Sequence, residues 1–235
     1  SGTVTLGTAG TDFVDAQVSA EAGFTLTHGA NHTIDGAGQI GGDVVNNGLI
    51  TANVPASIGI RVQDTIDQSG GGSLSADGAD ITLNTATVIG GTITTSAGGA
   101  LTLVNSPSIL TGAPQVSGSI NIPGGGNTLE LASDVTVDGT ITINSTSQVF
   151  NSNLRFTDSV TLSGVAEILM VIASTDTNDA KIEAPDTLVA TPGPDVDTHR
   201  TARLTGILAL HASPGTVRPP TPLEISDTPT NVPAP

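Results

Sequence analysis

A short motif recurs along the middle of the chain and constrains the fold more than any other feature. In this motif a glycine is followed by Ser or Thr, then by an aliphatic residue, and then by Ser, Thr or Asn. The motif occurs at residues 71–76, 90–95, 117–122 and 138–143. Alignment of its aliphatic residues, Leu74, Ile93, Ile120 and Ile141, gives spacings of 19, 27 and 21 residues. Periods near 20 residues with two or three short strands each are typical of stacked β-solenoid coils, so we predict an all-β solenoid.

Helix signals are nearly absent, because apolar residues alternate with Thr, Ser and Asn in short runs broken by Gly. The candidate strands are residues 3–6, 23–27, 48–52, 72–75, 80–83, 91–94, 100–104, 118–122, 128–131, 139–143 and 159–162. The uneven spacing requires residues 107–116 and 123–127 to loop out of the coils. An antiparallel β-sandwich with long loops would give a similar pattern and is the alternative fold.

The pattern divides the chain into three parts. Residues 1–170 carry the repeats and form the predicted solenoid. Repeats are no longer visible after Leu169, and residues 171–212 include an apolar stretch, 204–210, which we expect to form a C-terminal cap or additional strands. Residues 213–235 are dense in Pro and predict an extended tail.

Composition excludes several classes of partner. The formal net charge of −16 and the few scattered cations oppose contact with phosphate backbones, so we predict no nucleic-acid partner. No apolar run is long enough for a membrane-spanning helix, so we predict no membrane insertion. Cysteine is absent, which excludes disulfides and thiolate chemistry within this chain. The start at Ser1 without a basic, apolar leader is what an exported chain would show after removal of a signal peptide.

Two runs in the first quarter carry a family resemblance. HTIDGAGQIGG at residues 32–42 and VNNGLITA at residues 45–52 resemble the repeats of large secreted bacterial surface proteins and autotransporter-like passengers. Residues 91–100, 138–144 and 158–164 continue the likeness, which covers roughly residues 23–165. The resemblance implies a right-handed parallel β-helix, an extracellular or cell-surface location, and a mechanical or adhesive role.

Histidine and acidic residues are the candidates for metal binding. His28 and His32 lie four residues apart, but a strand and turn surround them, and zinc sites need three or four ligands. We therefore predict that both are solvent-facing turn residues, and His199 and His211 have no metal-binding pattern either. The carboxylates of residues 176–179 and 195–197 match no known calcium loop and are predicted to be solvated. We predict no cofactor, and calcium is the one ion with candidate ligands.

Two carboxylate groupings prompt the question of catalysis. Many parallel β-helices cleave acidic polysaccharides with paired carboxylates and a basic residue on one outer sheet. Arg61 with Asp64 and Asp67, or Glu130 with Asp134, would be such sets. The chain has no Trp or Tyr to stack on sugars and few cations to bind an acidic substrate. We predict that the chain is not an enzyme and has no catalytic, cofactor-binding or metal-binding residue.

Three hypotheses for function follow. The leading one is a structural subunit of an extracellular fibre, stalk or surface layer, which self-associates into a homopolymer through the solenoid ends and the extended tail. The first alternative is an adhesin or carbohydrate-binding module with a glycan or other cell-surface ligand. Within it, ice binding would use Thr-x-Thr rows such as Thr92 with Thr94 and Thr140 with Thr142. The second alternative is a polysaccharide-degrading β-helix enzyme or phage tail spike.

Overall fold

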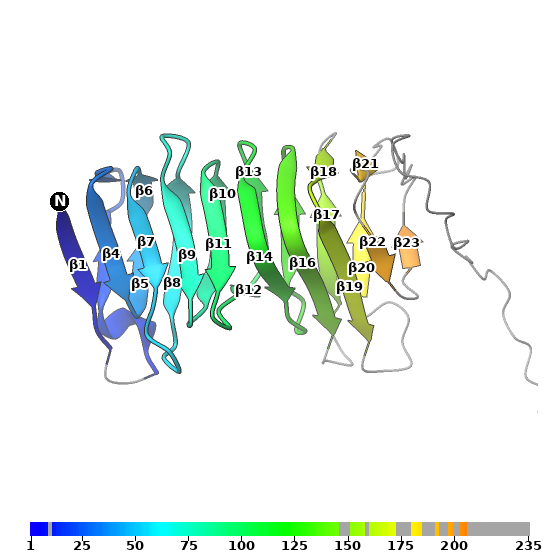
Figure 1. Cartoon of the computed structure of the whole chain (residues 1–235), viewed down its shortest axis with the longest axis horizontal. Helices are drawn as coiled ribbons and strands as arrows, with labels where there is room; N and C mark the ends of the chain where they lie inside the picture. Colours follow the sequence, from blue (N-terminus) through cyan, green and yellow to red (C-terminus); the bar gives the residue numbers. More distant parts are fainter. Residues whose placement is uncertain are drawn as a thin grey trace, which may run out of the picture.

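The chain winds as a right-handed parallel β-helix (Figure 1). The computed structural model describes residues 1–8, 11–145, 151–157, 160–172, 180–184, 191–192, 197–199 and 203–205. Within these residues every pairing between strands is parallel, as in β10 (Ile81–Ile89) with β8 (Ile60–Asp67). The predicted β-solenoid is confirmed, and the antiparallel sandwich is excluded because its strands would alternate in direction.

The strands stack into three faces, and each coil contributes one strand segment to each face. Face 1 contains β1 (Gly2–Leu6), β4 (His32–Gly36), β7 (Leu49–Ala52), β9 (Ser73–Asp77), β11 (Thr92–Ser96), the first parts of β14 (Gln115–Ile122) and β16 (Val135–Ser145), β18 (Thr161–Ser163) and β21 (Thr191–Pro192). Face 2 contains β2 (Gln17–Ser19), β5 (Gly38–Gly41), the first parts of β8 and β10, β12 (Leu101–Val104), the second parts of β14 and β16, β19 (Ala166–Ile172) and β22 (Asp197–His199). Face 3 contains β3 (Thr25–His28), β6 (Asp43–Asn46), the second parts of β8 and β10, β13 (Ser108–Thr111), β15 (Thr128–Leu131), β17 (Ser152–Phe156), β20 (Ala180–Glu183) and β23 (Arg203–Thr205). The described residues also include a 3₁₀ turn, η1 (Phe13–Asp15), between β1 and β2.

The core is a set of aliphatic rows that run along the solenoid axis. Alternate residues of each strand point inward, and each inward residue lies directly over its equivalent in the next coil. The row of face 1 is Ile34, Ile50, Leu74, Ile93, Val116 and Val137. All six are at most 3% exposed, although no single coil could bury them alone. Complete burial of one such side chain stabilises the fold by roughly 1.5–3 kcal/mol.

The predicted alignment of Ile93 with Ile120 is wrong, because the two residues lie on different faces. Ile93 pairs with Val116, whereas Ile120 pairs with Leu101 on face 2 and with Ile141 in the next coil. The two strand segments look alike in sequence because β14 continues from face 1 to face 2 through a bend at Gly118, where φ is 111°. The spacing of 27 residues therefore compares different faces. Along face 1 the spacings from Leu74 to Ile93, Val116 and Val137 are 19, 23 and 21 residues.

A predicted insertion also proves to be part of a coil. Residues 107–116 contain β13 and the first residues of β14, and Leu110 is completely buried between Val88 and Leu131. The proline at position 107 immediately precedes the strand, where it costs no ladder hydrogen bond. Residues 123–127 do form a turn between β14 and β15.

Strand pairing continues beyond the last visible repeat. Within residues 171–212, β20 pairs with β17, β21 with β18 and β22 with β19, and β23 pairs with β20. These strands extend the same three faces. The Pro-rich segment 213–235 lies outside the described residues.

The corner between faces 2 and 3 carries backbone strain at one residue. Thr85 interrupts the pairing of β10 with β8 and has φ 54°, which is unusual for a β-branched side chain. Neighbouring coils place Asp64 (φ 60°) and Asn105 (φ 58°) near the same corner, and Asp and Asn tolerate this conformation.

Replacement of Thr85 by Asn is expected to raise the free energy of unfolding by about 1 kcal/mol, because Asn adopts positive φ more readily. Urea unfolding followed by circular dichroism would measure the change. Thr87→Asn, in the following strand segment, is the matched control and should not stabilise the fold. Equal effects of the two substitutions would contradict the strain at Thr85.

Candidate functional site

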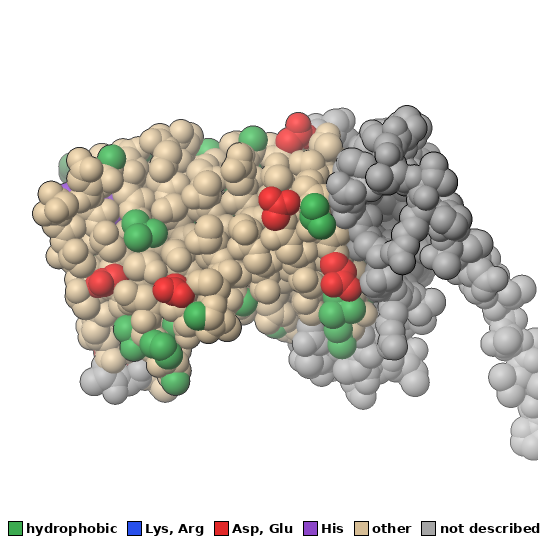
Figure 2. Space-filling model, viewed as in Figure 1, with side chains coloured by type: hydrophobic (Ala, Val, Ile, Leu, Met, Phe, Trp, Pro, Cys, Tyr) green, Lys and Arg blue, Asp and Glu red, His purple; other side chains and the backbone are tan. Residues whose placement is uncertain are grey.

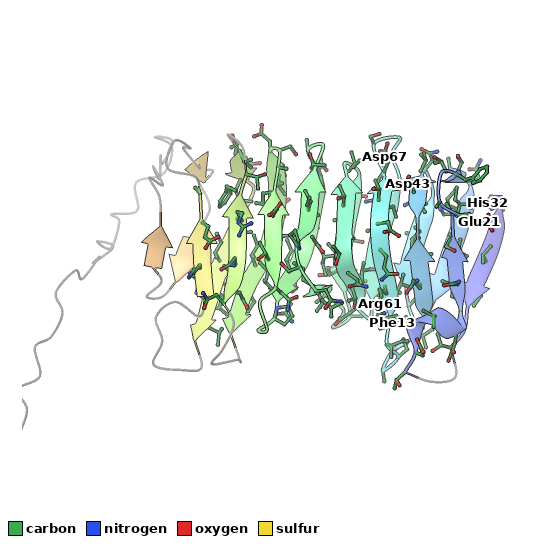
Figure 3. The ribbon with its side chains drawn as sticks, turned by 180° about the vertical axis from the view of Figure 1, so that it is seen from behind. Phe13, Glu21, His32, Asp43, Arg61 and Asp67 are labelled. Atoms are coloured by element: carbon green, nitrogen blue, oxygen red, sulfur yellow. The ribbon has the colours of Figure 1, made fainter. Side chains whose placement is uncertain are left out.

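The first grouping that was considered for catalysis, Arg61 with Asp64 and Asp67, does not converge. The Arg61 guanidinium lies over the Phe13 ring at 4.0 Å from its centroid, and Figure 3 shows the two side chains together at one edge of the solenoid. Asp64 accepts a hydrogen bond from the Gly42 N–H at 2.9 Å. Asp67 lies toward the opposite edge in Figure 3. These three groups therefore make separate structural contacts and do not face one another across a cleft.

Asp67 is stabilised as the carboxylate by its own turn. Hydrogen bonds from the Ser69 side chain and backbone N–H lower the pKa of the Asp67 carboxyl. Because this pKa is depressed in the folded state, its contribution to stability is present above the unfolded pKa. That contribution is lost as the pH falls through the folded pKa. The shift is explained by the turn and requires no substrate.

The second grouping that was considered for catalysis, Glu130 with Asp134, is divided between two structural roles. On the outer side of face 3, Glu130, Arg155 and Glu183 lie in register in successive coils. Arg155 Nη1 is 2.9 Å from Glu130 Oε1, and Arg155 Nε is 3.2 Å from Glu183 Oε2. Asp134 accepts the Thr161 N–H at 2.7 Å instead of joining Glu130. Arg155 and Glu183 were not singled out from the sequence, because only the register of three coils brings them to Glu130.

Replacement of Arg155 by Met is expected to lower the free energy of unfolding by about 0.5–1 kcal/mol at low salt, because it leaves two neighbouring carboxylates without their shared cation. The Arg155 side chain is 41% exposed, so solvent screening limits the effect. Urea unfolding in dilute buffer and in about 1 M NaCl would test this, since salt screens exposed charges. An equal loss in both solutions would show that the aliphatic stem, and not the charge, contributes.

Several carboxylates connect adjacent coils by accepting backbone hydrogen bonds. Asp80 Oδ1 accepts the Ala100 N–H at 2.9 Å, and its Oδ2 accepts the Thr102 hydroxyl at 3.1 Å. Asp138 accepts the Val165 N–H at 3.0 Å in the same way. These N–H groups lie at corners, where the strand ladder does not supply an acceptor. In Figure 2 the acidic side chains are separated by neutral surface, which fits this dispersed role.

The prediction for His28 is wrong, because the residue is only 6% exposed and is the last residue of β3. His28 Nδ1 lies 2.6 Å from Asn46 Oδ1, which also accepts the Gly48 N–H at 3.1 Å. The Asn46 amide donates to Gln68 Oε1 at 3.0 Å. Asn46 Oδ1 can only accept, so His28 Nδ1 must donate. This buried polar row holds three successive coils at one corner.

The described residues do not assemble a metal site. The exposed His32 ring lies edge-on to His28 with 6.3 Å between ring centroids. Among the residues that the structure describes, no three His, Asp or Glu side chains are grouped so that they could hold a metal ion. Asp176, Asp179, Asp195 and His211 lie outside the described residues, and His199 is described only as the end of β22. That these acidic segments are solvated, with calcium as the one candidate ion, stays a prediction.

The two Thr-x-Thr segments lie on different faces. Thr92 and Thr94 belong to face 1, where Ser73 and Gln115 flank Thr92. Thr140 and Thr142 belong to face 2, where Ser119 and Glu167 flank Thr140. The outer residue type thus changes from coil to coil, and neither segment extends into an uninterrupted threonine array.

No helix in the described part of the chain is both long and apolar enough to cross a membrane. No protein-family model matches the chain, and no curated protein or solved structure matches it.

Proposed function

We propose that the chain is a structural element of an extracellular fibre, stalk or surface layer, and that it self-associates through the ends of its solenoid. The observation that carries this proposal is the continuity of the intercoil contacts. Aliphatic rows, strand ladders, the Glu130–Arg155–Glu183 row and the Asp80 and Asp138 contacts all connect one coil to the next. Such a molecule is a rod that carries load and spans distance along its axis.

The candidate chemical groups support the same role. Arg61, Asp64, Asp67 and Glu130 each serve a contact that stabilises a turn, a corner or a coil junction. An adhesive or catalytic role would instead call for polar groups that converge on one concave surface. The location at the cell surface rests on the resemblance of the repeats to secreted bacterial surface proteins.

Negative-stain electron microscopy of the purified chain would test the proposal. We expect regular filaments or sheets, because assembly through solenoid ends propagates a polymer. The same sample should be imaged with calcium and with a chelator, since loss of the polymers in chelator would place calcium at the joints. Short isolated rods under both conditions would contradict self-association, and screening for glycan ligands would then be the next step.

A further inference from the structure

We draw no further inference here: the strongest candidate, the hydroxyl-rich outer side of face 1, where Thr92 and Thr94 of β11 lie beside Ser73 and Ser75 of β9, is an unpartnered sheet face, and nothing in the structure shows what covers it.

Discussion

Replacement of Gly59 by Ala is expected to lower the free energy of unfolding by about 3–5 kcal/mol, as the sum of a positive-φ cost and a backbone clash. Gly59 has φ 74° and lies against the backbone of Asp80 in the next coil, where an added Cβ would meet the Asp80 carbonyl. The Gly59 carbonyl also accepts the Gly38 N–H at 2.9 Å, so the residue connects coils on both sides. It cannot move away from one coil without disturbing the other.

Gly98→Ala separates the two causes. Gly98 has φ 89°, but an added Cβ would meet no atom within 4 Å. Gly98→Ala should therefore lower the free energy of unfolding by only about 1–2 kcal/mol, which is the cost of positive φ for a residue with a side chain. Urea unfolding of both variants would measure the difference. Equal decreases in the free energy of unfolding of the two variants would show that the clash with Asp80 adds nothing to the effect of Gly59→Ala.

Replacement of Leu83 by Ala is expected to lower the free energy of unfolding by about 2–5 kcal/mol through loss of apolar burial and formation of a cavity. Leu83 is fully buried and lies in register with Val62 below it and Leu103 above it on face 2. Neither neighbour can relax far into the space, because each is itself held between two coils. Urea unfolding monitored by far-ultraviolet circular dichroism would report the loss.

Thr82→Ala is the matched control for this substitution. Thr82 precedes Leu83 in β10 but points outward, where it is partly exposed. Thr82→Ala is expected to lower the free energy of unfolding by less than about 1 kcal/mol, which is within the range of β-propensity differences. A loss as large as that of Leu83→Ala would contradict the assignment of the inward row.

The sequence predicted the architecture because the solenoid repeats a local pattern. The recurring motif, in which Gly and then Ser or Thr precede an aliphatic residue, aligns Leu74 with Ile93 correctly, and the structure pairs them directly. The error at Ile120 has a physical cause. The inward and outward alternation has a period of two residues on every face, so sequence alone does not say which face a segment occupies. Where a strand continues through a corner, as β14 does at Gly118, two segments of the same coil look alike.

The candidate site was less accessible from sequence. The strand-and-turn surroundings of His28 and the lack of a third metal ligand predict a solvent-facing turn residue, yet Asn46 of the next coil supplies a hydrogen-bond partner inside the corner. Arg155 is separated by 25 residues from Glu130 and by 28 from Glu183, which exceeds any local motif. The sequence separation of such contacts is set by the number of residues in each coil, and this number varies with the lengths of the corners.

The strict neighbour-to-neighbour pairing of coils has an evolutionary consequence. Since each coil contacts only the coils on either side, duplication or deletion of one whole coil would preserve all remaining junctions wherever the flanking rows match. Each such event would change the length of the rod by roughly 4.8 Å, the spacing between paired strands. The length of the solenoid would thereby change in uniform increments during evolution, while the contacts between neighbouring coils stay the same.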